Sequence, residues 1–159
     1  MRILRSINGF ADEVGCTLQT GGKGVIEVTT PFYLAGGNPL RFCIEERDGD
    51  TIRMTDNGDV LFHMAGHGID ASGPSAWYEV IQIVDAFGVQ VSYTGEITGG
   101  DKVSEAQSLV IRYLSALLAV AAFERKCLGE IEEQTDERAR SANWLLGTML
   151  NKGPRVSYS

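Results

Sequence analysis

The feature of this sequence that most constrains its fold is an apolar stretch, LVIRYLSALLAVAAF, at residues 109–123. No charged residue interrupts residues 116–123, and a helix that is apolar on every side must be surrounded by protein or by lipid. The uninterrupted run is shorter than the roughly 20 residues that a membrane-spanning helix needs, and charged residues lie close to both of its ends. We therefore expect a helix over residues 105–128 that is buried at the centre of a folded domain.

The charge of the chain is negative and unevenly distributed. Lys and Arg number 14 against 21 Asp and Glu, which gives a formal net charge of -7 and opposes attraction to nucleic acid. Between Arg53 and Lys102 no Lys or Arg occurs. The acids of that stretch are Asp56, Asp59, Asp70, Glu79, Asp85, Glu96 and Asp101. We expect an acidic surface suited to a basic partner, and the alternative is a solvated face that only keeps the protein soluble.

The cysteines and the N-terminus favour a cytoplasmic protein. Cys16, Cys43 and Cys127 are widely separated and form no CxxC pair, which is typical of reduced thiols. The first 15 residues contain neither a continuous apolar core nor a small-residue cleavage site. We expect neither secretion nor a membrane association.

The first half of the chain predicts a helix followed by an antiparallel sheet. Apolar residues at helical spacing predict an amphipathic helix that ends near Gly15. Residues 25–32 and 40–46 alternate between apolar and polar side chains, the period-2 pattern of half-buried strands. With short strands at residues 17–19 and 51–55, we expect a meander of about four strands.

The second half predicts helices around a small hairpin. Asp59 is the predicted N-cap of a short helix, and a second helix follows at residues 75–87. A hairpin over residues 89–98 precedes the long helix, whose predicted end is Gly129. The predicted fold class is therefore α+β, with Trp77, Tyr78 and Phe87 in the core or at its margin.

The last part of the chain is predicted to form an extension of that domain. We expect an α+β domain at residues 1–128, a C-terminal helical extension at 129–151 and a flexible tail at 152–159. The extension ends in an apolar cluster that either folds back on the domain or contacts a second copy in a homodimer. The residues predicted for self-association are Trp144, Leu145 and Met149.

Two histidines supply the strongest signal for a metal. His63 and His67 stand four residues apart, and Asp59 precedes the first by four, so a continuous helix would place all three on one face. Two imidazoles and a carboxylate can bind zinc or iron. Because Gly66 and Gly68 interrupt a regular helix there, we expect no metal or other cofactor and keep this set as an alternative.

A second alternative is a metal-dependent phosphodiesterase or nuclease that uses Asp56, Asp59, His63 and His67. Such sites usually add a lysine beside the acids, and the neighbouring strand supplies only arginine. No GxSxG, HExxH or GxGxxG motif occurs in the chain. Catalysis is therefore not predicted.

Several short motifs resemble those of a known family. They are the strand at residues 26–32, the turn at 55–58, the Gly68-Ile69 and Phe87-Gly88-Val89 bends, and the apolar helix at 109–123. Together they resemble an uncharacterised prokaryotic and phage family catalogued as domain of unknown function 1828. The resemblance covers roughly residues 1–128 and implies an α+β fold in a bacterial or phage setting, without an agreed activity.

The chain departs from that family pattern at three positions. Leu34 and Asn38 replace acids that often follow the first matching strand, and Asn57 replaces the second acid of the turn. A carboxylate-based catalytic site would therefore be incomplete in this chain.

These observations favour a non-catalytic, cytoplasmic protein-binding module. One concrete version is a phage-encoded, anti-CRISPR-like inhibitor in the bacterial host cell, whose acidic side chains occupy the place of phosphates on a basic nucleic-acid-binding defence complex. A dimeric regulatory or structural subunit is a further alternative. The residues predicted to contact the partner are Asp56, Asp59, Asp70, Glu79 and Asp85.

Overall fold

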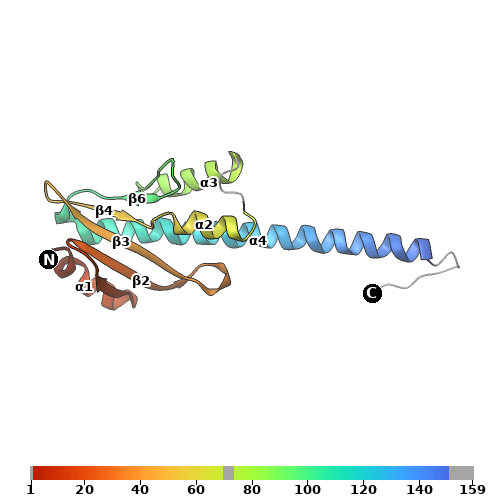
Figure 1. Ribbon diagram of the computed structural model, residues 1–159, viewed down its shortest axis with the longest axis horizontal. Helices are drawn as coiled ribbons and strands as arrows, with labels where there is room; N and C mark the ends of the chain where they lie inside the picture. Colours follow the sequence, from red (N-terminus) through yellow and green to blue (C-terminus); the bar gives the residue numbers. More distant parts are fainter. Residues whose placement is uncertain (1, 70–73, 151–159) are drawn as a thin grey trace. The chain divides into compact units, whose positions relative to one another are not determined.

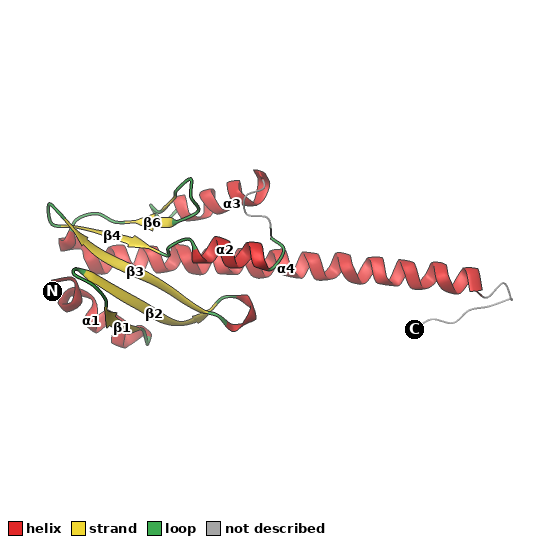
Figure 2. Ribbon diagram, viewed as in Figure 1, coloured by secondary structure: helices red, strands yellow, loops and turns green. Residues whose placement is uncertain are grey.

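The computed structural model describes the backbone of residues 2–69 and 74–150 and the side chains of residues 3–69 and 76–129. Two compact units make up the chain, Met1–Glu124 and Arg125–Ser159, and the first contains the sheet and its core. Figures 1 and 2 show the elements. In chain order they are α1 (Arg2–Val14), β1 (Thr17–Thr20), β2 (Val25–Tyr33), the short 3-10 helix η1 (Ala35–Gly37), β3 (Pro39–Arg47), β4 (Thr51–Thr55), α2 (Asp59–Gly66), α3 (Pro74–Asp85), β5 (Gln90–Val91), β6 (Ile97–Gly99), η2 (Val103–Glu105) and α4 (Ala106–Leu150).

The described strands form one antiparallel sheet in the order β1-β2-β3-β4-β6-β5. The meander runs through β1 to β4, and the later hairpin joins its edge where Met54 pairs with Gly99 and Thr55 with Thr98. The predicted α+β class, with an N-terminal helix, a meander, two helices, a small hairpin and a long helix, is confirmed.

One face of the sheet is buried and the other is not. In β2 and β3 the buried residues alternate with exposed or half-buried ones, as the pleat of a strand requires. Ile26 pairs with Ile44 and Val28 with Phe42, so their side chains line up across the strands on the buried face. The helices that supply the core therefore lie on that face.

The first part of α4, drawn as a red ribbon in Figure 2, supplies much of that core through its buried side chains. Tyr113, Leu117 and Val120 are fully buried. The Tyr113 ring meets the Phe42 ring edge-on, with centroids 5.1 Å apart, and its hydroxyl donates a 2.6 Å hydrogen bond to the carbonyl oxygen of Ile97. Burial raises the pKa of Tyr113 well above its ordinary value, so it stays a neutral donor. The predicted burial is confirmed for one side of this helix, whereas Ile111 and Ala122 on it are exposed.

The same helix meets a composition criterion for a membrane span. Within Val103–Gly129, a window of 18 residues has a mean hydropathy of 1.6, and half of that window is buried in the fold. Core helices of soluble proteins meet the same criterion, because they too are apolar on a broad face. In this helix Tyr113, Leu117 and Val120 are fully buried, whereas Ile111 is 43% exposed.

The predicted end of this helix at Gly129 is wrong. The helical backbone of α4 continues through Gly129 to Leu150. A glycine inside a helix costs only about 1 kcal/mol relative to alanine, and the residues after it are good helix formers, so the helix propagates through it. Trp144, Leu145 and Met149 lie on this helix with side chains outside the described residues, and their role in self-association stays a prediction. The tail at 152–159 also lies outside them.

Gly100 lies where the chain that leaves β6 passes close to the backbone of β4. Its φ is 149°, and a Cβ at this position would overlap the carbonyl oxygen of Ile52. We expect Gly100→Ala to lower the free energy of unfolding by about 2–4 kcal/mol, measured by urea denaturation.

Gly9→Ala in α1 is the matched control. A Cβ at Gly9 meets nothing within 4 Å, so this variant gains helix propensity and should be about 0.5–1 kcal/mol more stable than the wild type. Equal effects of the two substitutions would contradict the close approach at Gly100.

Candidate functional site

The start of α2 is fixed by a buried carboxylate. Asp56 is 1% exposed, and its Oδ1 accepts hydrogen bonds from the backbone N–H groups of Gly58, at 3.0 Å, and Ile97, at 2.9 Å. Its Oδ2 accepts one from the N–H of Val60 at 3.0 Å. The carboxylate therefore joins the first turn of α2 to β6.

Two sequence predictions at this turn are wrong. The N-cap of α2 is Gly58, in the left-handed conformation, while Asp59 is the first helical residue. The capping carboxylate comes from Asp56, which sequence reasoning had placed on a partner-binding surface. Burial raises the pKa of Asp56 against the opposing effect of its amide hydrogen bonds. A side chain so enclosed has a structural role.

A groove lies between α2 and the connection from β2 to β3. Its volume is about 450 Å³, within the range of small-ligand sites. Leu34, Asn38 and Pro39 line it from the β2–β3 side. From α2 it is lined by Asp59, Phe62, His63 and His67, among others.

His63 meets a buried acid behind this groove. Its Nε2 lies 3.4 Å from Oε2 of Glu124 in α4, and the two side chains are 9% and 0% exposed. This separation permits an ion pair only if the imidazole is protonated, and neither atom makes a hydrogen bond. Among the described residues these are the only buried side-chain nitrogen and oxygen atoms without a hydrogen-bond partner. Such a pair is costly unless something completes it.

The other polar side-chain atoms of His63 and Glu124 contact neighbouring polar groups. Oε1 of Glu124 accepts a 2.9 Å hydrogen bond from the N–H of Ala35 in η1. Nδ1 of His63 lies 3.1 Å from the amide nitrogen of Asn38. These contacts fix the β2–β3 connection to α2 and α4 and orient both side chains.

The imidazole ring of His67 lies next to that of His63. Its ring centroid is 4.5 Å from that of His63, at an interplanar angle of 45°. Its Nε2 and Cε1 face Gly36, where a Cβ would come within 3.3 Å of them. Gly36 also has a φ of 84°, so a residue other than glycine would be strained there and would crowd the imidazole.

The remaining described residues predicted for partner binding lie on two helices. Asp59, Glu79 and Asp85 are exposed on α2 and α3, whereas Asp70 lies outside the described residues. Tyr78 is 62% exposed, so its predicted place in the core or at its margin is wrong, whereas Trp77 and Phe87 are half-buried, as a place at the margin requires. Phe62 and Tyr93 are also exposed, at 83% and 96%.

The predicted nuclease set is not assembled. In the part of the chain whose side chains are described, no three His, Cys, Asp or Glu side chains are placed to hold a metal ion. The carboxylate of Asp56 is directed to backbone amides instead. Glu124, the acid nearest to His63 Nε2, was missed by sequence reasoning, and so was the role of Asn38. The available signal was that Glu124 directly follows the apolar run at residues 109–123.

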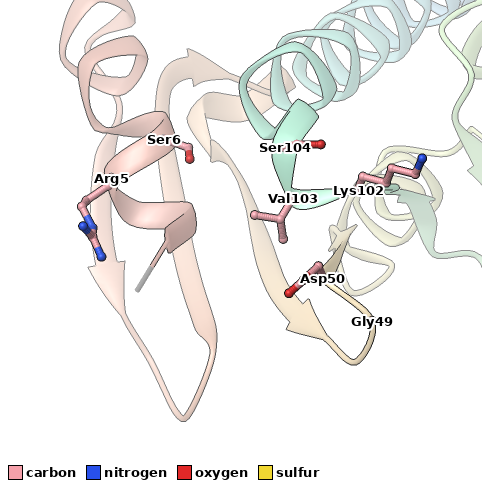
Figure 3. A pocket seen from close by; sticks show the side chains of 7 residues that line it. All are labelled: Arg5, Ser6, Gly49, Asp50, Lys102, Val103 and Ser104. Atoms are coloured by element: carbon pink, nitrogen blue, oxygen red, sulfur yellow. The ribbon is translucent and has the colours of Figure 1, made fainter.

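A second pocket, with a volume of about 600 Å³, is larger than the groove beside α2 (Figure 3). Its lining comes from α1, the β3–β4 turn and the residues before α4. The side chains of Arg5 and Lys102 point away from each other in Figure 3. Because its two cations do not converge, the groove beside α2 is the better candidate site.

The three amide hydrogen bonds of Asp56 predict a specific loss. In Asp56→Asn the side-chain NH₂ replaces one accepting oxygen, so a buried backbone N–H loses its acceptor. We expect the free energy of unfolding to fall by about 1–3 kcal/mol in urea denaturation at pH 7. Asp59→Asn, at the exposed neighbouring acid, should change it by less than about 0.5 kcal/mol. Equal losses in the two variants would contradict the capping role.

Comparison with known proteins identifies a family but no activity. The family model described as "Domain of unknown function DUF1828" matches residues 30–120, which is more than half of the chain. No curated protein and no solved structure gives a significant match. The matched region includes β3, α2 and the first turns of α4, and thus His63 and His67 of the groove. The chain belongs to the DUF1828 family.

Proposed function

We propose that this protein is a non-catalytic binding module that engages a basic protein surface. The observation that carries the proposal is the exposure of carboxylates and aromatic rings within one stretch of chain, residues 54–101, that contains no Lys or Arg. The exposed acids are Asp59, Glu79 and Asp85, and the exposed aromatic residues are Phe62, Tyr78 and Tyr93.

The acids support a cationic partner because their charge is not neutralised locally. Among the described residues none of the three carboxylates forms a salt bridge. The nearest arginine in sequence, Arg53, is already paired with Glu96 at 2.7 Å. Its hydrogen bond lowers the pKa of Glu96, which stays ionised and holds the arginine on the sheet. Free carboxylates of this kind favour Lys and Arg from another protein and repel phosphates.

The aromatic rings support the same class of partner. Phe62 is 83% exposed on the rim of the groove, and Tyr93 is 96% exposed in the β5–β6 turn. Large aromatic side chains are enriched at protein interfaces, where they supply most of the binding energy. They also bind guanidinium and ammonium groups through cation–π contacts. Aromatic rings and unneutralised acids together suit a surface rich in arginine and lysine.

A more specific form of this proposal identifies the partner as a protein complex that normally binds nucleic acid. Proteins that hold nucleic acid present clustered Lys and Arg, so a module with this chemistry competes with phosphates for the same groups. We propose a cytoplasmic role in a bacterial cell as an inhibitor of such a complex, for example a phage-encoded inhibitor of a host defence complex. The family match is compatible with this role and does not itself assign it.

Capture from a bacterial lysate tests the proposal. The tagged protein is used at low and at raised salt, bound proteins are identified by mass spectrometry, and the affinity of the purified partner is then measured. We expect one basic partner that is lost as salt rises, because exposed ion pairs are screened. Neutralising Asp59, Glu79 and Asp85 to Asn, Gln and Asn should weaken the affinity about tenfold or more.

A charge-matched control separates the effect of these three acids from the effect of net charge. Asp12, Glu13 and Glu27 are exposed on α1 and β2, and neutralising them changes the net charge by the same amount. This control should retain nearly all of the affinity. Equal weakening by both triple variants, or the absence of any specific partner at either salt, would refute the proposal.

A further inference from the structure

We propose that His63, His67 and Glu124 form a binding site for a divalent transition-metal ion, with zinc as its type. The inference goes beyond the proposed binding function and does not depend on it. It starts from the two buried atoms without a hydrogen-bond partner, Nε2 of His63 and Oε2 of Glu124.

The spacing of these atoms suits a shared metal. They lie 3.4 Å apart. Two donors on one tetrahedral zinc, each about 2.0 Å from the ion, are separated by roughly 3.3 Å. The separation is therefore long for a hydrogen bond and ordinary for two ligands of one ion. A cation between them would also neutralise a carboxylate that is fully removed from water.

Both groups already have the outer contacts that ligands need. A metal-bound imidazole usually donates its other N–H to an oxygen, and a bound carboxylate is itself hydrogen-bonded. Oε1 of Glu124 accepts from Ala35 at 2.9 Å. The Asn38 amide lies 3.1 Å from Nδ1 of His63, and turning it over presents its oxygen to a protonated Nδ1. These contacts leave the unpartnered atoms as the metal-binding ends of both side chains.

His67 supplies the third donor after a change of its side-chain rotamer, because its Nε2 faces Gly36 in this structure and no three described His, Cys, Asp or Glu side chains are placed to hold an ion without that change. The backbone N–H of His67 bonds to the carbonyl of His63 at 3.2 Å, so the helical spacing that brings the rings to 4.5 Å persists at the end of α2. His67 is exposed, and rotation of its side chain brings its nitrogen toward the buried pair. His63 and His67 line the groove, from which water or another donor would supply the fourth ligand.

The donor set selects the class of ion. Two imidazoles and one carboxylate suit zinc, cobalt or nickel, whereas magnesium and calcium prefer oxygen donors only. Asp59, the acid that the sequence pattern had grouped with these histidines, is not needed. The bound ion would tie together α2, α4 and, through Ala35 and Asn38, the β2–β3 connection.

Cobalt and zinc titrations of the purified full-length protein test the site. We expect one equivalent of Co²⁺ to give the visible absorption of a tetrahedral complex, and Zn²⁺ to displace it and to raise the melting temperature. Glu124→Gln, whose amide oxygen can still accept from Ala35, should weaken zinc binding about 100-fold or more because a ligand is lost. Asp59→Asn is the control and should bind zinc as the wild type does.

His67→Gln keeps the test valid if Glu124→Gln fails to fold. His67 is exposed, so this variant should melt like the metal-free wild type and bind zinc at least about tenfold more weakly. No tetrahedral cobalt spectrum in the wild type, or zinc affinity unchanged in His67→Gln, would overturn the proposal. Loss of binding in Asp59→Asn equal to that in Glu124→Gln would also overturn it, since it would move the site to the exposed face of α2.

Discussion

Burial of one side of α4 against the sheet is the constraint on which the rest of the domain depends. The sheet offers a single apolar face, and Tyr113, Leu117 and Val120 are fully buried in the core on that side. Polar groups on the same side of the helix must then find partners inside the protein. Tyr113 finds one in the carbonyl of Ile97, which links the helix to the late hairpin. Glu124, some three turns further on, has only part of its hydrogen-bonding capacity filled.

The two carboxylate oxygens of Glu124 have different surroundings, and this difference explains how the residues behind the groove are arranged. One carboxylate oxygen holds η1 through Ala35, and the other faces the imidazole of His63 on α2. The position of α2 is set independently from its other end, where Asp56 joins its first turn to β6. One buried carboxylate, Asp56, thus fixes the first turn of α2, and a second, Glu124, meets His63 further along the same helix. Of the two carboxylates, Glu124 has an oxygen without a hydrogen-bond partner, which an additional group could contact.

Local patterns predicted the elements but not the contacts between them. The alternation in β2 and β3 and the apolar run of α4 each report burial directly, so the α+β fold could be read from them. Asp56 and Asp59 look equivalent in the sequence, and only the fold makes one a buried cap and the other a surface acid. Gly129 predicts a helix end, but the residues after it favour a helix and α4 continues through it. Glu124 stands 61 positions from His63 in the printed sequence, and no spacing rule connects them.

The most direct test of this account is the state of the His63 imidazole nitrogens. Long-range ¹H–¹⁵N NMR of histidine-labelled protein, recorded with and without one equivalent of zinc, reports which nitrogen carries a proton and which binds metal. We predict that zinc moves the Nε2 signal of His63 to a metal-bound shift, while Nδ1 becomes protonated and faces Asn38. A His63 ring whose two nitrogen signals do not change on adding zinc would contradict the account, and would leave His63 and Glu124 as a buried pair with only each other.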